Sequence, residues 1–295
     1  MIGYPISSEK LKALIESDQP GWLKKAADRT KTFRKKKTYS EKTPIWSLVK
    51  PTYMKLQGHS KCAYCERKME SIDYGKGEQD IEHFRPKGNV REWPLPDHLT
   101  AQGIKATRVL KKKGGYYLLP YHSFNYAAAC KPCNSALKSD CFPIAGNYSL
   151  KGDDPSALLR EQPFLVYPIG DFDESPESLI HFYGVSPQAV VKSGHKRNRA
   201  LVTIEFFKLD DAVKRKNLLL DRANVIVGLY PQLEKVADGA TGPDRSIAIQ
   251  LIDSFMSPKG RHTNCARCFK KLFEQNRAEA KTLFGSAVNL VISSS

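Results

Sequence analysis

Two Cys-x-x-Cys pairs, Cys62/Cys65 and Cys130/Cys133, constrain this chain more than any other feature of its sequence. Each pair presents two thiolates on one tight turn, a zinc knuckle, and four sulfur ligands match the tetrahedral coordination that Zn²⁺ prefers. A repeated pair of this kind is a specific signal for a structural zinc site. We therefore predict that the four cysteines bind one zinc ion and that the chain folds around it.

The length and composition are those of a globular protein. With 295 residues, of which 41% are hydrophobic and 10% aromatic, the chain is long enough to bury a large core. It has no apolar run long enough to cross a membrane, and its first residues lack the apolar segment of a secretion signal. Seven cysteines, four of them in knuckles, favour a reducing compartment over a disulfide framework. We therefore expect a cytoplasmic protein with no membrane partner.

The chain is strongly basic. It holds 47 Lys and Arg against 31 Asp and Glu, a formal charge of +16, which indicates an anionic partner such as nucleic acid. Residues 1–61 carry 14 of the basic residues and only 5 acidic ones. A well-solvated surface is the plain alternative, but such a surplus beside a predicted metal site favours contact with phosphate.

Hydrophobic periodicity predicts an α+β fold that is mainly helical. We divide the chain into a basic helical N-terminal region (1–55), a core that contains the knuckles (56–150) and a mainly helical C-terminal region (151–295). Helices are predicted over 8–29 with a break at Pro20, and over 46–56, 134–138, 210–229, 247–256 and 269–284. Strands or extended segments are predicted around 81–84, 116–121, 161–172 and 178–186.

Four polar residues near the knuckles form a candidate catalytic set: Glu82, His83, Asn125 and Asn134. Hydrolysis of a phosphodiester needs a base that activates water and a cation that offsets developing charge. Histidine suits the first task near neutral pH, and carboxylate and amide oxygens suit Mg²⁺. Successive strand residues point to opposite faces, so Glu82 and His83 would act together only where the strand bends or ends.

Three cations near this set, Arg85, Lys87 and Lys138, are candidates for phosphate contact, with solvated surface charges as the alternative. Asn134 has an alternative role as the cap of the helix it begins, and Asn125 as a turn residue. A third Cys-x-x-Cys pair, Cys265/Cys268, follows His262, with Cys141 as the one spare thiol. Two reduced thiols at a helix start are favoured there over a second zinc site.

The order CAYCE, IEHFRPKG, YYLLPYHSFNYAAACKPCN resembles the HNH endonuclease superfamily, which has a ββα-metal fold. Within it, the chain is most similar to the zinc-bearing branch that includes the PtuB-type effectors of anti-phage systems. The likeness spans about residues 55–225 and is strongest over 62–143.

The resemblance implies roles for individual residues. His83 would be the general base, Glu82 and Asn134 would hold a catalytic Mg²⁺ or Mn²⁺, and Asn125 would fix the loop and the orientation of the histidine. Cys62, Cys65, Cys130 and Cys133 would hold the structural Zn²⁺.

The implied function is a metal-dependent endonuclease acting on nucleic acid, with DNA favoured and RNA also open, in anti-phage defence. An ATPase partner is expected to be a separate chain, because no GxxxxGK[ST] motif occurs here. The competing class is a non-catalytic zinc module that binds nucleic acid through its basic N-terminal region.

Overall fold

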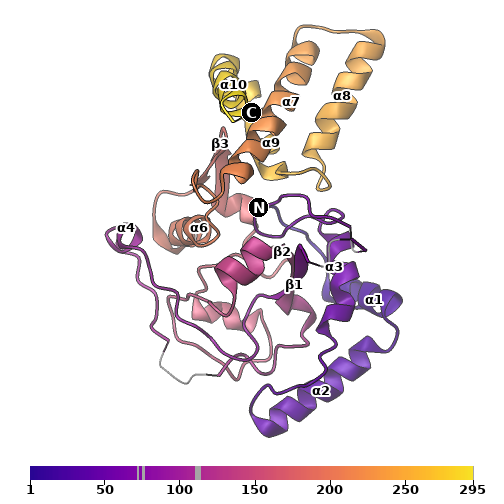
Figure 1. The fold of residues 1–295 in the computed structure, drawn as a ribbon, viewed down its shortest axis with the longest axis vertical. Helices are drawn as coiled ribbons and strands as arrows, with labels where there is room; N and C mark the ends of the chain where they lie inside the picture. Colours follow the sequence, from indigo (N-terminus) through magenta and orange to yellow (C-terminus); the bar gives the residue numbers. More distant parts are fainter. Residues whose placement is uncertain (72, 75–76, 110–113, 295) are drawn as a thin grey trace.

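The computed structural model describes residues 1–71, 73–74, 77–109 and 114–294, and it is mainly helical with two small sheets (Figure 1). The helices are α1 (Ser8–Asp18), α2 (Trp22–Lys36), α3 (Lys50–Leu56), α4 (Asp97–Thr100), α5 (Pro176–Leu179), α6 (Gly194–Phe206), α7 (Lys216–Ala237), α8 (Gly242–Met256), α9 (Thr263–Gln275) and α10 (Arg277–Ile292). The strands are β1 (Gln79–His83), β2 (Tyr126–Cys130), β3 (Ile180–Tyr183) and β4 (Ser186–Ala189). Three 3₁₀ turns, Trp46–Val49, Ser123–Asn125 and Ala157–Glu161, and a π-helical segment, Pro132–Lys138, complete the list. The predicted α+β, mainly helical class is confirmed at this level.

The antiparallel pair of β1 and β2 lies at the centre of the molecule (Figure 1). Its register sets Gln79 opposite Cys130 at one end and His83 opposite Tyr126 at the other. Every residue of β2 is buried, and three consecutive alanines allow the surrounding elements to approach its backbone closely. This pair therefore joins the knuckle end of the core to the histidine end.

The second edge of β2 is closed by a side chain. Gln57, which is fully buried, donates from Nε2 to the carbonyl of Ala128 at 2.8 Å and accepts the Ala128 amide at Oε1, 2.7 Å away. The Ala63 amide also donates to the Ala128 carbonyl, at 3.0 Å. The backbone groups that Ala128 turns away from β1 are thus satisfied inside the fold.

The N-terminal helices differ from the prediction in their boundaries. The predicted helix over 8–29 is divided into α1 and α2 at Pro20 and Gly21, where Gly21 takes the left-handed φ of 75° that glycine tolerates best. Helix α2 continues to Lys36, so the basic residues Arg34–Lys36 form its last turn. There, positive charge is favourable to the helix dipole.

The C-terminal region is a group of helices in which α8, α9 and α10 all pack against α7 (Figure 1). Helix α7 begins six residues later than the predicted 210–229. Neither α6 nor β4 was predicted. The predicted strand over 116–121 is wrong: this segment forms turns, and its Tyr116 and Tyr121 are buried in the core.

One hydrophobic core runs through all three predicted regions, from Met1 through Tyr126 to Ala287. The boundaries at 55 and 150 therefore divide the sequence but do not divide this core. In the described residues, no helix combines the length and apolarity that crossing a bilayer requires.

Candidate metal centre and active site

Cys62, Cys65, Cys130 and Cys133 come together as the sequence predicts. All four are buried, and their sulfur atoms lie within 4.8 Å of one another. The Sγ atoms of Cys65 and Cys130 are 3.8 Å apart. A tetrahedral zinc site with Zn–S bonds of about 2.3 Å separates its sulfurs by about 3.8 Å. These four side chains could therefore hold a metal such as zinc.

Backbone and side-chain donors support the sulfur cluster. The Cys130 amide donates to Cys62 Sγ at 3.4 Å, and the Arg215 guanidinium lies 3.7 Å from Cys133 Sγ. Four thiolates around a divalent ion leave a net negative charge, which these donors offset. Arg215 was not singled out in the sequence, because 82 positions separate it from Cys133.

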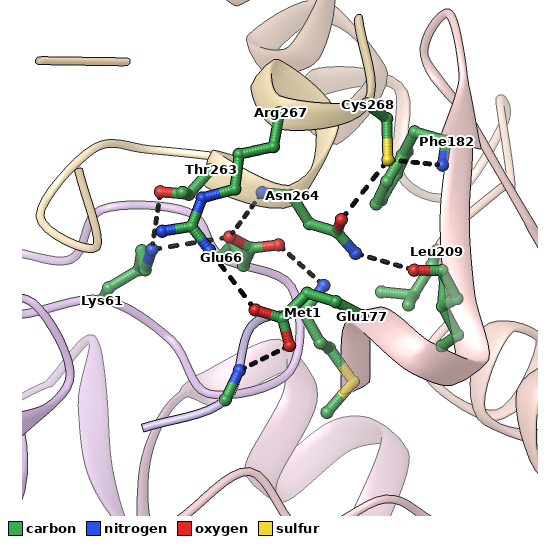
Figure 2. Close-up of polar contacts among 12 residues, drawn as sticks. Met1, Lys61, Glu66, Glu177, Phe182, Leu209, Thr263, Asn264, Arg267 and Cys268 are labelled. Carbon is green, nitrogen blue, oxygen red and sulfur yellow. Dashed lines mark hydrogen bonds and ion pairs between the residues drawn. The ribbon is translucent and has the colours of Figure 1, made fainter. Parts of the chain in front are cut away.

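The first knuckle is anchored by Glu66, the residue directly after Cys65 (Figure 2). Its carboxylate contacts the Met1 amine at 2.7 Å, Lys61 Nζ at 3.4 Å and the Asn264 amide at 3.3 Å. Lys61 Nζ also donates to Thr263 Oγ1 at 3.0 Å. The knuckle turn is thus tied to the start of α9 by buried charges. Nothing but its position after Cys65 points to Glu66 in the sequence.

His83 ends β1 and is 5% exposed. Its Nε2 lies 3.2 Å from the Pro120 carbonyl and its Nδ1 lies 3.4 Å from Lys87 Nζ, while the rings of Trp46 and Tyr126 pack edge-on against it. Burial and the Lys87 ammonium lower the pKa of His83 well below its ordinary value. The imidazole is therefore neutral near pH 7, and donation from Nε2 to Pro120 leaves the lone pair on Nδ1.

Glu82 is paired with a lysine. Its Oε1 lies 2.5 Å from Lys138 Nζ, and the same ammonium donates to the His83 carbonyl at 2.9 Å. Burial raises the pKa of Glu82, and Lys138 opposes that rise. The expected phosphate contact of Lys138 is therefore wrong for this structure: the side chain is fully buried and committed to residues at the end of β1.

Asn125 holds the loop after β1. Its Oδ1 accepts the Arg85 amide at 2.8 Å, its Nδ2 donates to the carbonyls of Arg85 and Leu119 at 3.1 Å each, and its backbone carbonyl accepts the Phe84 amide at 2.9 Å. These bonds fix the two residues that follow His83. They also hold Leu119, the residue before Pro120, and the Pro120 carbonyl is the partner of the histidine ring.

Arg85 does not face solvent, so its expected contact with substrate phosphate is wrong. The side chain is fully buried, pairs with Glu161 at 3.3 Å and donates to the Leu158 carbonyl at 3.1 Å. Its guanidinium also lies over the rings of Tyr116 and Phe142. Arg85 is a structural cation in the core, and its carboxylate partner lies 76 positions away in the sequence.

Lys87 is the one predicted phosphate contact that remains half-exposed. Its ammonium lies 5.0 Å from the centre of the Trp46 ring and 6.0 Å from that of Tyr39. Tyr39 follows the basic last turn of α2 and packs against Phe33 of that helix, with ring centres 5.2 Å apart. The basic N-terminal region therefore borders the histidine. The sequence suggested only a core role for Trp46.

In the part of the chain that it describes, the structure brings together the predicted zinc ligands but not a comparable set of Mg²⁺ ligands. Asn134 is half-exposed in the first turn of the segment Pro132–Lys138, and its backbone carbonyl accepts the Ser139 amide at 2.6 Å. Among the described residues, the sulfur cluster is the one group of three or more His, Cys, Asp or Glu side chains close enough to share an ion. A hard cation at Glu82 and Asn134 therefore stays a prediction.

The third Cys-x-x-Cys pair lies in the first turns of α9, where Cys265 Sγ donates to the Gly184 carbonyl at 3.3 Å and Cys268 Sγ to Asn264 Oδ1 at 3.4 Å. The His262 ring faces Asp221, 3.8 Å away. These contacts agree with the favoured interpretation, two reduced thiols at a helix start.

No protein-family model, curated protein or solved structure matches this chain. What the site can do therefore follows from its own geometry.

Proposed function

We propose that this protein is a metal-dependent endonuclease that hydrolyses phosphodiester bonds of nucleic acid, with His83 as the general base. The observation that carries the proposal is the setting of the His83 ring. One nitrogen is held by the Pro120 carbonyl, and the other faces the half-exposed Lys87 beside the basic end of α2. A neutral imidazole with a fixed tautomer has a lone pair that can accept a proton from water, while its lowered pKa makes it a weaker base than a free histidine.

Lys87 and the cations of α2 would bring the phosphate to the histidine. Lys87 Nζ is 3.4 Å from Nδ1, so a phosphate that pairs with this ammonium comes within reach of the lone pair. Attack by water would then transfer a proton to Nδ1 as the new P–O bond forms and the 3′ oxygen leaves. Asn125 and Pro120 keep the ring in place during this transfer.

Glu82 and Asn134 are the residues that would hold a Mg²⁺ or Mn²⁺ ion. Such an ion would offset the charge of the phosphate and of the leaving oxygen. For Glu82 to become a ligand, its carboxylate would first have to leave Lys138. Lys138 would then keep its bond to the His83 carbonyl, which leaves the end of β1 in position.

The test is cleavage of plasmid DNA, single-stranded DNA and RNA with Mg²⁺ or Mn²⁺, each compared with the same buffer without added divalent metal. We expect metal-dependent cleavage that falls about 10²- to 10⁴-fold in His83→Ala, the range for loss of a general base. His98→Ala is the control, because His98 is an exposed histidine of α4. Cleavage by His83→Ala at the wild-type rate would refute the assignment of the base.

A second candidate function is a zinc-dependent module that binds nucleic acid without cutting it. The observation that favours it is the closed state of the site: Glu82 is paired with Lys138, and His83 is 5% exposed. This candidate predicts salt-sensitive binding with no cleavage of any substrate in either metal.

We further propose, from the resemblance, a role as the effector of an anti-phage system whose activity an ATPase partner restrains. Co-purification of the two chains, with less cleavage by the complex than by this chain alone, is the expected result. Equal cleavage by both forms would contradict the regulatory part of the proposal.

A further inference from the structure

A groove lined by basic residues follows one face of α7. Two pockets, of about 340 and 560 Å³, are lined by successive turns of this helix, and together they are called the basic groove. Arg261 of the larger pocket and Asp221 of the smaller one lie 3.9 Å apart. Asn217, Asp221 and Asn224 follow one another at helical spacing along its floor, so the groove extends over two turns of the helix.

The charge of this groove is almost all of one sign. Four basic residues line the smaller pocket and two line the larger one, and they are Arg67, Lys214, Arg215, Lys216, Lys259 and Arg261. Asp221 is the one acidic residue lining it, and its carboxylate faces Arg261 and His262. Helix α7 begins here without an acidic residue in its first turn and without a side-chain cap, so its dipole adds to the positive potential.

The cations differ in how freely they can bind a ligand. Arg215 is held by Cys133 Sγ and the Phe207 carbonyl, and Arg67 lies 3.8 Å from Glu78. Lys214 and Lys216 are exposed and take part in no ion pair within the described ranges, and the Asp211 carboxylate accepts the Lys214 amide at 2.8 Å. Two exposed lysines and a fixed guanidinium suit an extended anion that passes along the groove.

We propose that this basic groove binds the phosphodiester backbone of nucleic acid, as a second contact region separate from the His83 site. The proposal rests on the nucleic-acid partner of the proposed function and adds the C-terminal region to the binding surface. The groove adjoins the knuckles through Arg67 and Pro132, at the Cys130 end of the β1–β2 pair. His83 lies at the other end, about 14 Å along a strand of this length.

The test measures binding without cleavage. Kd for labelled duplex DNA, single-stranded DNA and RNA is measured by fluorescence anisotropy in buffer without added divalent metal, on a His83→Ala background, over a range of salt concentrations. The test variant combines Lys214→Glu with Lys216→Glu. The control combines Lys235→Glu with Lys281→Glu, the same charge change at exposed lysines of α7 and α10.

We expect the test variant to weaken binding about tenfold or more, and to reduce the slope of log K against log salt by about 2, since each lost phosphate contact removes about 0.9. The control should change Kd by less than about threefold. Equal weakening in both variants would overturn the proposal, because the effect would then come from net charge alone. The milder pair Lys214→Gln and Lys216→Gln keeps the test valid if charge reversal impairs folding.

Inorganic phosphate, added at constant ionic strength, distinguishes a polymer from a small anion. Little competition supports the polymer, whereas displacement of nucleic acid well beyond the effect of chloride would overturn the assignment to a phosphodiester backbone. The two proposals fail separately. A protein that binds through the groove but cleaves nothing refutes only the nuclease, and one that cleaves with an unchanged Kd in the test variant refutes only the groove.

Discussion

Glu66→Gln provides the most quantitative test of how the first knuckle is held. Burial alone would raise the pKa of Glu66, but the Met1 ammonium and Lys61 outweigh it and lower the pKa from 4.5 to about 2. Each pKa unit is worth about 1.4 kcal/mol, so the ionised carboxylate contributes about 3 kcal/mol of folding free energy at neutral pH. The substitution also leaves two buried cations without their anion, a loss that typically costs about 3–5 kcal/mol.

The pH dependence of this stability difference tests whether Glu66 acts in its ionised form. The folded-state pKa is lowered, so the contribution is complete above the unfolded value of about 4.5 and disappears as pH falls through about 2. We therefore expect wild type and Glu66→Gln to differ by about 3–5 kcal/mol at pH 7, with the difference shrinking below about pH 4.5.

Urea unfolding at a series of pH values, with zinc content measured at each, provides the assay. Glu70→Gln is the matched control, because Glu70 is exposed and close by in the sequence. A difference below about 1 kcal/mol at pH 7, or one that stays constant down to pH 3, would refute the reasoning.

Three other predictions concern the same core. Purified protein should contain one zinc equivalent, and Cys130→Ser should lose it with a lower Tm, as measured by atomic emission and thermal unfolding; full zinc retention would contradict the site. Arg85→Met should lower the unfolding free energy by about 3–5 kcal/mol, because Glu161 stays buried without its partner, while the folded protein should bind nucleic acid with unchanged Kd. Lys138→Met removes the ammonium that opposes the rise in the pKa of Glu82, so ionised Glu82 becomes more costly to bury. The unfolding free energy, measured in urea, should therefore fall more at pH 8 than at pH 5, and an equal loss at both would be evidence against the ion pair.

The sequence predicted those features that depend on residues close together in the chain. The spacing within each Cys-x-x-Cys pair fixes a turn, and the four cysteines meet as expected. The strand around 81–84 and the short helix over 134–138 were also predicted near their observed bounds. The break at Pro20 follows from the missing backbone donor of proline and the left-handed conformation of Gly21.

What the sequence did not reveal depends on partners far apart in the chain. Arg85 looked like a surface cation because no residue near it in the sequence indicates that it pairs with Glu161. Burial of the pair depends on the complete fold. Lys138 is similar, since its partner Glu82 lies on another element. The basic groove combines Arg67 with Lys214 and Lys216, about 150 positions later, so no window of sequence contains it.

The side-chain closure of β2 has a consequence for the metal-free protein. Gln57 and the Ala63 amide occupy the hydrogen-bonding positions at which a further strand could add, and Ala63 belongs to the first knuckle. Loss of the ion would free this turn and expose an apolar alanine strand to neighbouring molecules. Chelation should therefore lead to intermolecular β-pairing and visible precipitation, and a Gln57→Ala variant should precipitate at lower chelator concentration than wild type.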